Sequence, residues 1–388
     1  MSSWFCPEVL LVLSGVGLIL ADSFIPEGKK GWIPGAALLF SFVILVFTLG
    51  QSGQPMPSSW QNLFLTDGLS SVFKPFFVLC LLGVTVISVR TPMGNEERVR
   101  AEWIALPFFP TAGLCLLVSA HDFLAIFVAL ELVAISLYLL AAFHRTRAAS
   151  LEAGMKLLVM GGLSTGFLVM GIAWLYAAAG STEFSKILVE QAGRPATLPL
   201  LFAIGLILTG LAFKVAAVPF HAWAPDVYEG APTSTTAFLA VASKAAGFVL
   251  LVRIFGFGAF ALDSVAVFYR PVLLTLGIAT VTLGTLAALP QRNLKRYLAY
   301  SGIAHAGYML LALGTLGEAG MGTVVGYLWA YLLSTFPVLI FIQEMERIHG
   351  SADIRHLEGL GQKDRGVAPI GLKVSTEARK SQGINFVP

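Results

Sequence analysis

Ionisable side chains lie inside long apolar segments of this sequence, where a charge is costly. Glu131, Lys214 and Lys244 fall near the middle of three such segments, and Lys156 lies nearer the end of a fourth. At the centre of a membrane helix a charged residue costs about 2.5–3.5 kcal/mol on insertion scales, so it usually marks a functional site. The set contains both signs of charge, one carboxylate and several ammonium groups. The pattern predicts a path for charge across a membrane.

Glu131 and Lys214 suit a switch in which a carboxylate controls the proton of a lysine. A buried lysine exchanges its proton more readily than an exposed one, and a nearby carboxylate makes it hold that proton. Lys244 has Ser and Gly neighbours that leave room for water. The alternative interpretation of Glu131 is a neutral carboxyl group that is hydrogen-bonded between helices.

Two prolines follow Lys214 and predict a broken helix. Pro219 lies five residues after the lysine, and Pro225 follows it. Proline removes a backbone donor and clashes with the preceding turn, so the helix should break near 214–229. A broken helix inside a membrane is tolerated where it is buried in protein or lines a wet cavity. An ordinary proline kink without a function is the alternative.

Further titratable residues extend the predicted relay. His221 and His305 carry imidazole groups, which exchange protons near neutral pH. For His305, a hydrogen-bonded core residue is the alternative. Lys156 either bridges Lys214 and Lys244 or extends to the membrane surface. The sequence alone does not decide between these two roles.

Composition places the chain in a membrane. Its 388 residues are 56% hydrophobic and 12% charged, whereas a soluble domain is about 25% charged. The mean hydropathy is +0.80. Continuous apolar runs exclude a β-barrel, because barrel strands alternate. We therefore predict an all-α polytopic bundle with lipid as its surroundings, and no nucleic-acid partner, since basic patches with interleaved aromatics are absent from the sequence.

Eleven apolar runs are long enough to cross a bilayer. They cover about 7–25, 32–50, 70–90, 103–120, 122–143, 153–178, 198–220, 232–256, 271–289, 296–316 and 321–343. Lys and Arg gather in alternate loops, which predicts that these loops are cytoplasmic and the N-terminus is outside. Gly162 with Gly166, and Gly322 with Gly326, suggest close helix packing.

Redox chemistry and metal binding are not expected on this chain. Cys6, Cys80 and Cys115 are scattered in apolar surroundings without CxxC spacing, as expected of small buried side chains. Nucleotide-binding loops, haem ligand pairs and iron–sulfur cysteine sets do not occur in the sequence. Any redox step must take place on another chain.

Three stretches resemble a known family. Residues 213–233 read FKVAAVPFHAWAPDVYEGAPT, residues 130–132 and 137–139 read LEL and LYL, and residues 301–308 read SGIAHAGY. They resemble the antiporter-like membrane subunits of proton-pumping NADH-quinone oxidoreductase (respiratory complex I), in particular the subunit N group. The related Mrp-type cation/proton antiporter subunits share the lysine and the HxWxPD core but usually differ just after it. The resemblance covers about residues 5–361.

The resemblance implies two inverted repeats of five helices, each with a broken helix. Glu131, Lys214 and Lys244 match the key residues of the first repeat. The implied divisions are 1–102 for the N-terminal helices, 103–257 for the first repeat, 258–345 for a partial second repeat and 346–388 for a polar tail. NADH, FMN, iron–sulfur clusters and quinone are implied in partner subunits, and the complex is implied to lie in a bacterial inner membrane.

The chain departs from the family after Gly361. Family members have about fourteen spans, and the tail from Gln362 to Pro388 has no run long enough to span. A truncated reading frame, a fragment and a short homologue are the three explanations. Proton translocation coupled to quinone reduction is the predicted function; a Mrp-type sodium/proton antiporter subunit and a non-pumping structural subunit are the alternatives.

Overall fold

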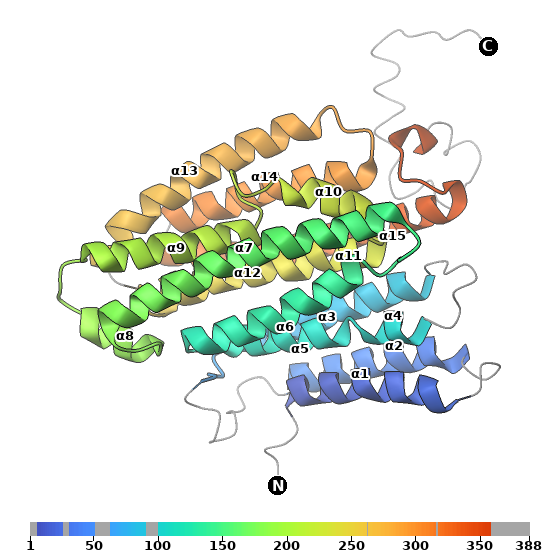
Figure 1. The fold of residues 1–388 in the computed structure, drawn as a ribbon, viewed down its shortest axis with the longest axis horizontal. Coiled ribbons are helices and arrows are strands. Elements are labelled where there is room, and N and C mark those ends of the chain that lie inside the picture. The colour runs from blue at the N-terminus through green and yellow to red at the C-terminus, as the bar shows by residue number, and fades with distance from the viewer. Residues whose placement is uncertain are drawn as a thin grey trace.

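The computed structural model describes residues 6–25, 31–50, 63–90, 100–261, 263–315 and 317–357, and in these residues the chain is nearly all helical. The long helices run side by side, from α1 and α2 at one side of the bundle to α13 and α14 at the other (Figure 1). The helices are α1 (Pro7–Phe24), α2 (Ile33–Gly50), α3 (Gly68–Arg90), α4 (Arg100–Ala105), α5 (Phe108–Ser119), α6 (Phe123–Ala141), α7 (Ala148–Ala179), α8 (Phe184–Gln191), α9 (Leu198–Lys214), α10 (Trp223–Gly230), α11 (Thr233–Ala237), η3 (Phe238–Ser243), α12 (Lys244–Leu251), η4 (Val252–Phe257), α13 (Asp263–Ala288), α14 (Leu294–Thr315), α15 (Gly317–His349) and η5 (Ile354–Leu357).

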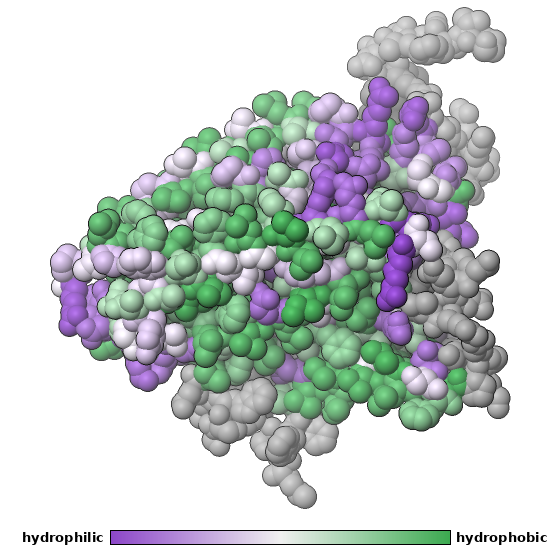
Figure 2. Space-filling model, viewed as in Figure 1, coloured by the Kyte–Doolittle hydropathy of each residue, from purple (hydrophilic) through white to green (hydrophobic). Residues whose placement is uncertain are grey.

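The helices have the length and surface of membrane spans. Within the described residues, nine helical segments are long and apolar enough to cross a bilayer. Together with α9 and α14 they account for the eleven predicted spans. Apolar residues cover the visible face along the helices, while hydrophilic residues gather at the two ends of the long axis (Figure 2). The prediction of an all-α polytopic bundle is confirmed.

One helix forms the centre of the bundle. The most apolar 18-residue stretch of Thr233–Gly256 is entirely buried inside the protein, whereas only 17% of the corresponding stretch of α7 is buried. This central helix is continuous but changes pitch, because η3 and η4 are π-helical. Short π-helical segments inside α-helices occur frequently at functional sites. Here η3 ends directly before Lys244.

Glycines allow α7 and α9 to approach closely, but they are not the glycines expected from the sequence. A Cβ atom on Gly171 would lie 2.9 Å from the backbone nitrogen of Ile207, and one on Gly210 would lie 3.1 Å from the Ser164 carbonyl oxygen. By contrast, Gly162, Gly166, Gly322 and Gly326 have nothing within 4 Å of their Cβ positions among the described residues. The predicted close packing at those four glycines is therefore not found among the described residues.

A buried ion pair joins α1 to α3. The Lys74 Nζ lies 2.8 Å from Glu8 Oε1, and the two residues are only 9% and 4% exposed. Neither carboxylate oxygen accepts a hydrogen bond of normal geometry from the described residues, so the contact is chiefly electrostatic. Both residues lie at the ends of apolar runs, which is why the sequence did not single them out.

Removing one member of this pair should destabilise the fold. Lys74→Met leaves the Glu8 carboxylate buried without a counter-charge, and we expect a loss of about 3–5 kcal/mol of unfolding free energy. Replacing both partners, as Glu8→Leu with Lys74→Met, should restore most of that stability, because no charge then remains buried. Equilibrium unfolding in mixed micelles measures both variants. Equal destabilisation of the single and the double variant would contradict the interpretation.

Candidate functional site

The helix that carries Lys214 is interrupted directly after that residue. The α-helix α9 ends at Lys214, and α10 begins only at Trp223. Ala216, in the connection, has a φ of 58°, which is uncommon for a residue with a side chain and strained. Pro219 lies in the connection, as expected of a helix breaker. Pro225 lies in the first turn of α10, where a proline is tolerated.

Side chains from other elements form hydrogen bonds with backbone groups at and near the break. The Trp223 Nε1–H donates to the Phe213 carbonyl oxygen over 3.3 Å, and the two rings stack at 5.4 Å between centroids. The Ser164 hydroxyl of α7 donates to the Gly210 carbonyl oxygen over 2.9 Å. The Val218 N–H donates to the Thr280 hydroxyl of α13 over 2.9 Å. Neighbouring helices therefore stabilise the interruption through specific hydrogen bonds.

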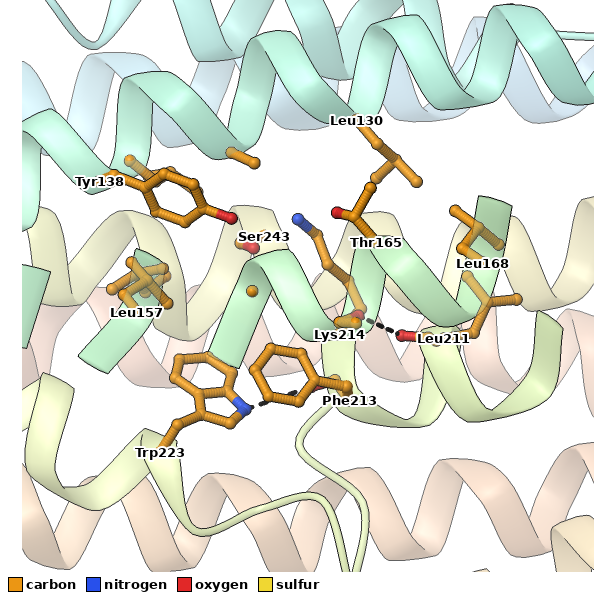
Figure 3. Close-up of a pocket in the computed structure, with 16 residues that line it drawn as sticks. Leu130, Tyr138, Leu157, Thr165, Leu168, Leu211, Phe213, Lys214, Trp223 and Ser243 are labelled. Atoms are coloured by element: carbon orange, nitrogen blue, oxygen red, sulfur yellow. Dashed lines mark hydrogen bonds between the residues drawn. The ribbon is translucent and has the colours of Figure 1, made fainter. Parts of the chain in front are cut away.

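A cavity of about 50 Å³ lies beside Lys214. The Lys214 amino group points into it, towards Tyr138, Thr165 and Ser243 (Figure 3). A cavity with polar walls holds a water molecule when it offers more than about 10–15 Å³ and two or more polar partners. The space beside Lys214 meets both conditions. The Lys214 ammonium group therefore has room for water beside it inside the bundle.

Glu131 lies beside this cavity without an ion pair to Lys214. Its Oε1 accepts a hydrogen bond from the Thr165 hydroxyl over 2.9 Å, and Thr165 also lines the cavity. The carboxylate is near enough to act electrostatically on the Lys214 ammonium group. Because the two groups interact without direct contact, a small shift or a bridging water can change their coupling.

Lys244 is buried in the central helix next to Lys214. Its residue is 3% exposed, and it has no hydrogen-bond or carboxylate partner in the part of the chain that the structure describes. Gly247, one turn further along, lets the end of α9 approach this helix: a Cβ atom there would lie 2.6 Å from Val215 and 3.4 Å from the Lys214 side chain. The end of α9 at Lys214 and the helix of Lys244 are thus in direct contact.

Aromatic and imidazole side chains surround the Lys244 ammonium group. Lys244 Nζ lies 5.6 Å from the centroid of the Tyr331 ring, which is within the range of a cation–π interaction. The Tyr331 ring lies 5.2 Å from the His305 ring. His305 Nδ1 lies 2.6 Å from the Tyr327 hydroxyl of α15. The structure therefore brings Lys244 and His305 into one cluster.

Lys156 lies outside this set, in a charged network at one end of the bundle. Its ammonium group pairs with Asp226 Oδ2 over 2.7 Å and with Glu152 over 2.7 Å. Arg296 binds the other oxygen of Asp226 over 2.7 Å and Glu229 over 3.0 Å. The Lys156 side chain is 39% exposed, and it does not line the Lys214 cavity. This placement favours the role in which Lys156 extends to the membrane surface over the role of a bridge between Lys214 and Lys244.

Asp226 makes this network sensitive to acid. Burial raises the pKa of its carboxyl group, but the hydrogen bonds and charges of Lys156 and Arg296 outweigh burial and hold the pKa below its usual range. A carboxyl group whose pKa is lowered on folding stabilises the fold above its unfolded value, about 3.9, and loses that contribution as the pH falls further. Glu152 and Glu229 are the other charged groups that face the network.

We therefore expect the network to weaken below about pH 4. The thermal unfolding midpoint of the unaltered protein should fall between pH 5 and pH 3. Asp226→Asn should lower the midpoint at pH 7 and flatten this dependence on pH, because the variant has no carboxyl group to protonate there. The measurement is the unfolding midpoint of both proteins across this range. Identical slopes would show that Asp226 does not carry the acid sensitivity.

His221 lies in the connection between α9 and α10 and is half-buried. Its Nδ1 is buried and has no hydrogen-bond partner among the described residues. The residue does not line the Lys214 cavity. The structure thus places His221 on the broken segment, as the sequence indicated, but does not bring it to the two lysines.

Several polar residues around the lysines did not stand out in the sequence. Tyr138 and Thr165 lie in apolar runs that contain other hydroxyl-bearing residues as well, so a hydroxyl group there is a weak signal on its own. Tyr138 follows Glu131 by two helical turns, so both occupy one face of α6. Tyr327 and Tyr331 are spaced by four residues and share a face of α15. Helical spacing from a charged residue such as Glu131 could therefore have indicated which hydroxyl-bearing residues lie near the site.

Comparisons with known proteins place the chain in a family. Residues 120–370 match the family model described as "NADH:quinone oxidoreductase/Mrp antiporter, TM". NADH-quinone oxidoreductase subunit N of Trichlorobacter lovleyi is 37% identical over 364 residues, which is 92% of this chain and 73% of that protein. Subunit N of Desulfovibrio desulfuricans is 38% identical over 87% of this chain and 67% of its own length. The chain belongs to the subunit N family of NADH-quinone oxidoreductases.

Solved structures agree with this membership. A chain of respiratory complex I from Thermus thermophilus with bound aureothin has a TM-score of 0.73 and 32% identity, covering 94% of this chain and 76% of that one. The membrane-bound sulfane sulfur reductase, an archaeal respiratory complex, contains a chain with a TM-score of 0.76 and 21% identity, covering 91% and 73%. The latter likeness shows a shared fold.

Within the residues that the structure describes, His, Cys, Asp and Glu do not gather in groups that could hold a metal ion.

Proposed function

We propose that this subunit N family member moves protons within a membrane-bound NADH-quinone oxidoreductase. The observation that supports this most is the position of Lys214: the residue ends α9 at the break, and its ammonium group points into a cavity with a few polar groups in a mainly apolar lining (Figure 3). The Glu131 carboxylate of α6, which accepts a hydrogen bond from Thr165, attracts this ammonium group electrostatically. An ion at this depth is retained at a cost, which favours a role in transport.

The proposed path crosses the bundle laterally. A proton held on Lys214 is controlled by Glu131: approach of the carboxylate favours the charged lysine, and separation favours release. Water in the cavity carries the proton towards Ser243, which directly precedes Lys244. Lys244 then hands it to the His305 side of the bundle. His221 and Lys156 stand nearer the surface and would supply protons to the path.

The partners follow from the family. We propose that the chain assembles with the other membrane subunits of complex I in a bacterial inner membrane, with its N-terminus outside. NADH, FMN, the iron–sulfur clusters and quinone would be bound by partner subunits, so this chain contributes to the translocase without a redox step of its own. Residues 103–257 would form the first antiporter-like repeat and 258–345 part of the second. The relatives named above carry the name subunit N, which favours this function over a Mrp-type antiporter or a purely structural role.

Glu131→Gln tests the proposed control of Lys214. Glutamine keeps the size and can still accept a hydrogen bond from Thr165, but it carries no charge. We expect proton transport per NADH oxidised to fall, because the lysine no longer meets a carboxylate that alternately holds and releases its charge. Proton uptake into vesicles that contain the assembled complex measures the effect.

Glu190→Gln is a matched control for this substitution. Glu190 lies on the surface in α8 and pairs only with Arg194 among the described residues. Its replacement should leave transport unchanged. Equal transport by the Glu131 variant, the Glu190 variant and the unaltered complex would remove Glu131 from the proposed path.

A further inference from the structure

Two polar groups from different helices meet over a single glycine of α14. A Cβ atom on Gly302 would lie 2.5 Å from Lys244 Nζ and 2.9 Å from the Tyr331 hydroxyl oxygen. The two groups therefore lie close to the same point, which only a residue without a side chain leaves open. Gly302 thus provides the space in which the lysine of α12 meets the tyrosine of α15.

The same tyrosine lies against the next titratable group. Its ring centroid is 5.2 Å from that of His305, which is one turn further along α14 than Gly302. Tyr331 is 6% exposed and Lys244 is 3% exposed, so bulk water does not fill the space between them. Besides Lys244 and His305, the polar groups that face Tyr331 are Tyr327 and Thr335 on its own helix and Tyr228 on α10.

We propose that the Tyr331 hydroxyl group passes protons between Lys244 and His305, with Gly302 as the residue that keeps this contact open. This inference rests on the proposed function and adds a residue to its path. A tyrosine hydroxyl both donates and accepts hydrogen bonds, so it can receive one proton and give up another without a lasting charge.

The transfer balances as two coupled steps. An N–H bond of the Lys244 ammonium group breaks while an O–H bond forms on Tyr331. The original O–H bond of Tyr331 breaks while an N–H bond forms on the Nε2 atom of His305. Lys244 is left as a neutral amine and His305 as an imidazolium ion, whose Nδ1 faces the Tyr327 hydroxyl at 2.6 Å. Rotation of the Tyr331 hydroxyl returns only that group to its starting orientation. The cycle is complete when Lys244 takes up a proton from the Lys214 side and His305 releases one.

Tyr331→Phe tests the role of the hydroxyl group alone. Phenylalanine keeps the ring and its cation–π contact with Lys244, so packing is largely preserved. We expect proton transport by the assembled complex to fall on the order of 100-fold, the low end for a positioned acid–base group. We also expect the ratio of rates in H₂O and D₂O to rise, because the hampered proton step then limits the rate; a merely structural defect would leave this ratio unchanged.

Tyr308→Phe is the matched control. Tyr308 lies on the other side of His305, with ring centroids 6.2 Å apart, and is 46% exposed. It should transport protons at the unaltered rate. Gly302→Ala is the second variant: it removes no polar atom, but its methyl group must push the lysine and the tyrosine apart, so it should show the same loss and the same isotope effect.

The outcomes separate this inference from the function on which it rests. Loss of transport in the Lys214 and Glu131 variants, with full transport in Tyr331→Phe, would overturn the role of Tyr331 alone. Full transport in all of them would overturn the proposed function. Loss in Tyr331→Phe and Gly302→Ala but not in Tyr308→Phe, at equal levels of assembled complex, is the result that we expect.

Discussion

Replacing Lys244 with methionine is expected to stop proton transport and at the same time to stabilise the protein. Lys244 is 3% exposed and faces an aromatic ring and a glycine, with no carboxylate beside it among the described residues. Methionine has a similar length and no charge. Exchanging a buried ionic group for a well-packed apolar one often gains about 1–4 kcal/mol of stability. Gain of stability with loss of function is typical of a residue retained for its chemistry.

The measurement combines two experiments on the same variant. Unfolding in mixed micelles should show a higher free energy of unfolding for Lys244→Met, and vesicles with the assembled complex should show little proton uptake. Lys186→Met is a control for the removal of a lysine, because that side chain is 68% exposed and pairs with Glu183. Full transport by Lys244→Met would remove this residue from the path, and a large loss of stability would mean that its charge is structural.

Replacing Lys214 with arginine is expected to block transport although the positive charge stays in place. Arginine does not release its proton in proteins, so it retains the electrostatic attraction to Glu131 but cannot pass the proton on. The cavity of about 50 Å³ offers some room for the larger head group. We expect transport to fall by about 100-fold or more, within the range for loss of a positioned acid–base group.

Lys214→Met distinguishes the two possible roles of the charge. A lysine that only attracts water or orients Glu131 would be replaced well by arginine and poorly by methionine. A lysine that carries the proton would be replaced by neither. Proton uptake by the two variants, at equal amounts of assembled complex, measures the difference. High transport by the arginine variant would contradict proton transfer through Lys214.

The sequence predicts the architecture well because a bilayer constrains it strongly. Twenty apolar residues without backbone partners outside the segment form a helix in lipid, so the runs correspond closely to the observed helices. Glu131, Lys214 and Lys244 could also be singled out, since an ion in such a run is rare, although Lys214 proves to end its helix instead of lying at the centre. Gly162 and Gly322, by contrast, show that a small-residue spacing does not reveal which faces of two helices meet.

The remaining features depend on distances between helices that the sequence does not contain. The break after Lys214 begins before Pro219, because the backbone turns at Ala216, and the Trp223 side chain donates a hydrogen bond to the Phe213 carbonyl oxygen there. Lys156 lies in a salt-bridge network because Asp226 is held near it by α10. The meeting of Tyr331 with Lys244 depends on Gly302, 58 residues further along the chain than Lys244. Such long-range placement follows only from the packed structure.

The number of protons moved per NADH oxidised tests the central claim most directly. The comparison is between assembled complexes that carry Lys214→Met with Lys244→Met, complexes that carry Lys186→Met, and unaltered complexes, all in closed vesicles. If protons pass through this chain by way of the two buried lysines, the double variant should move fewer protons per NADH than either of the others. The same number in all three complexes would contradict proton movement through this chain.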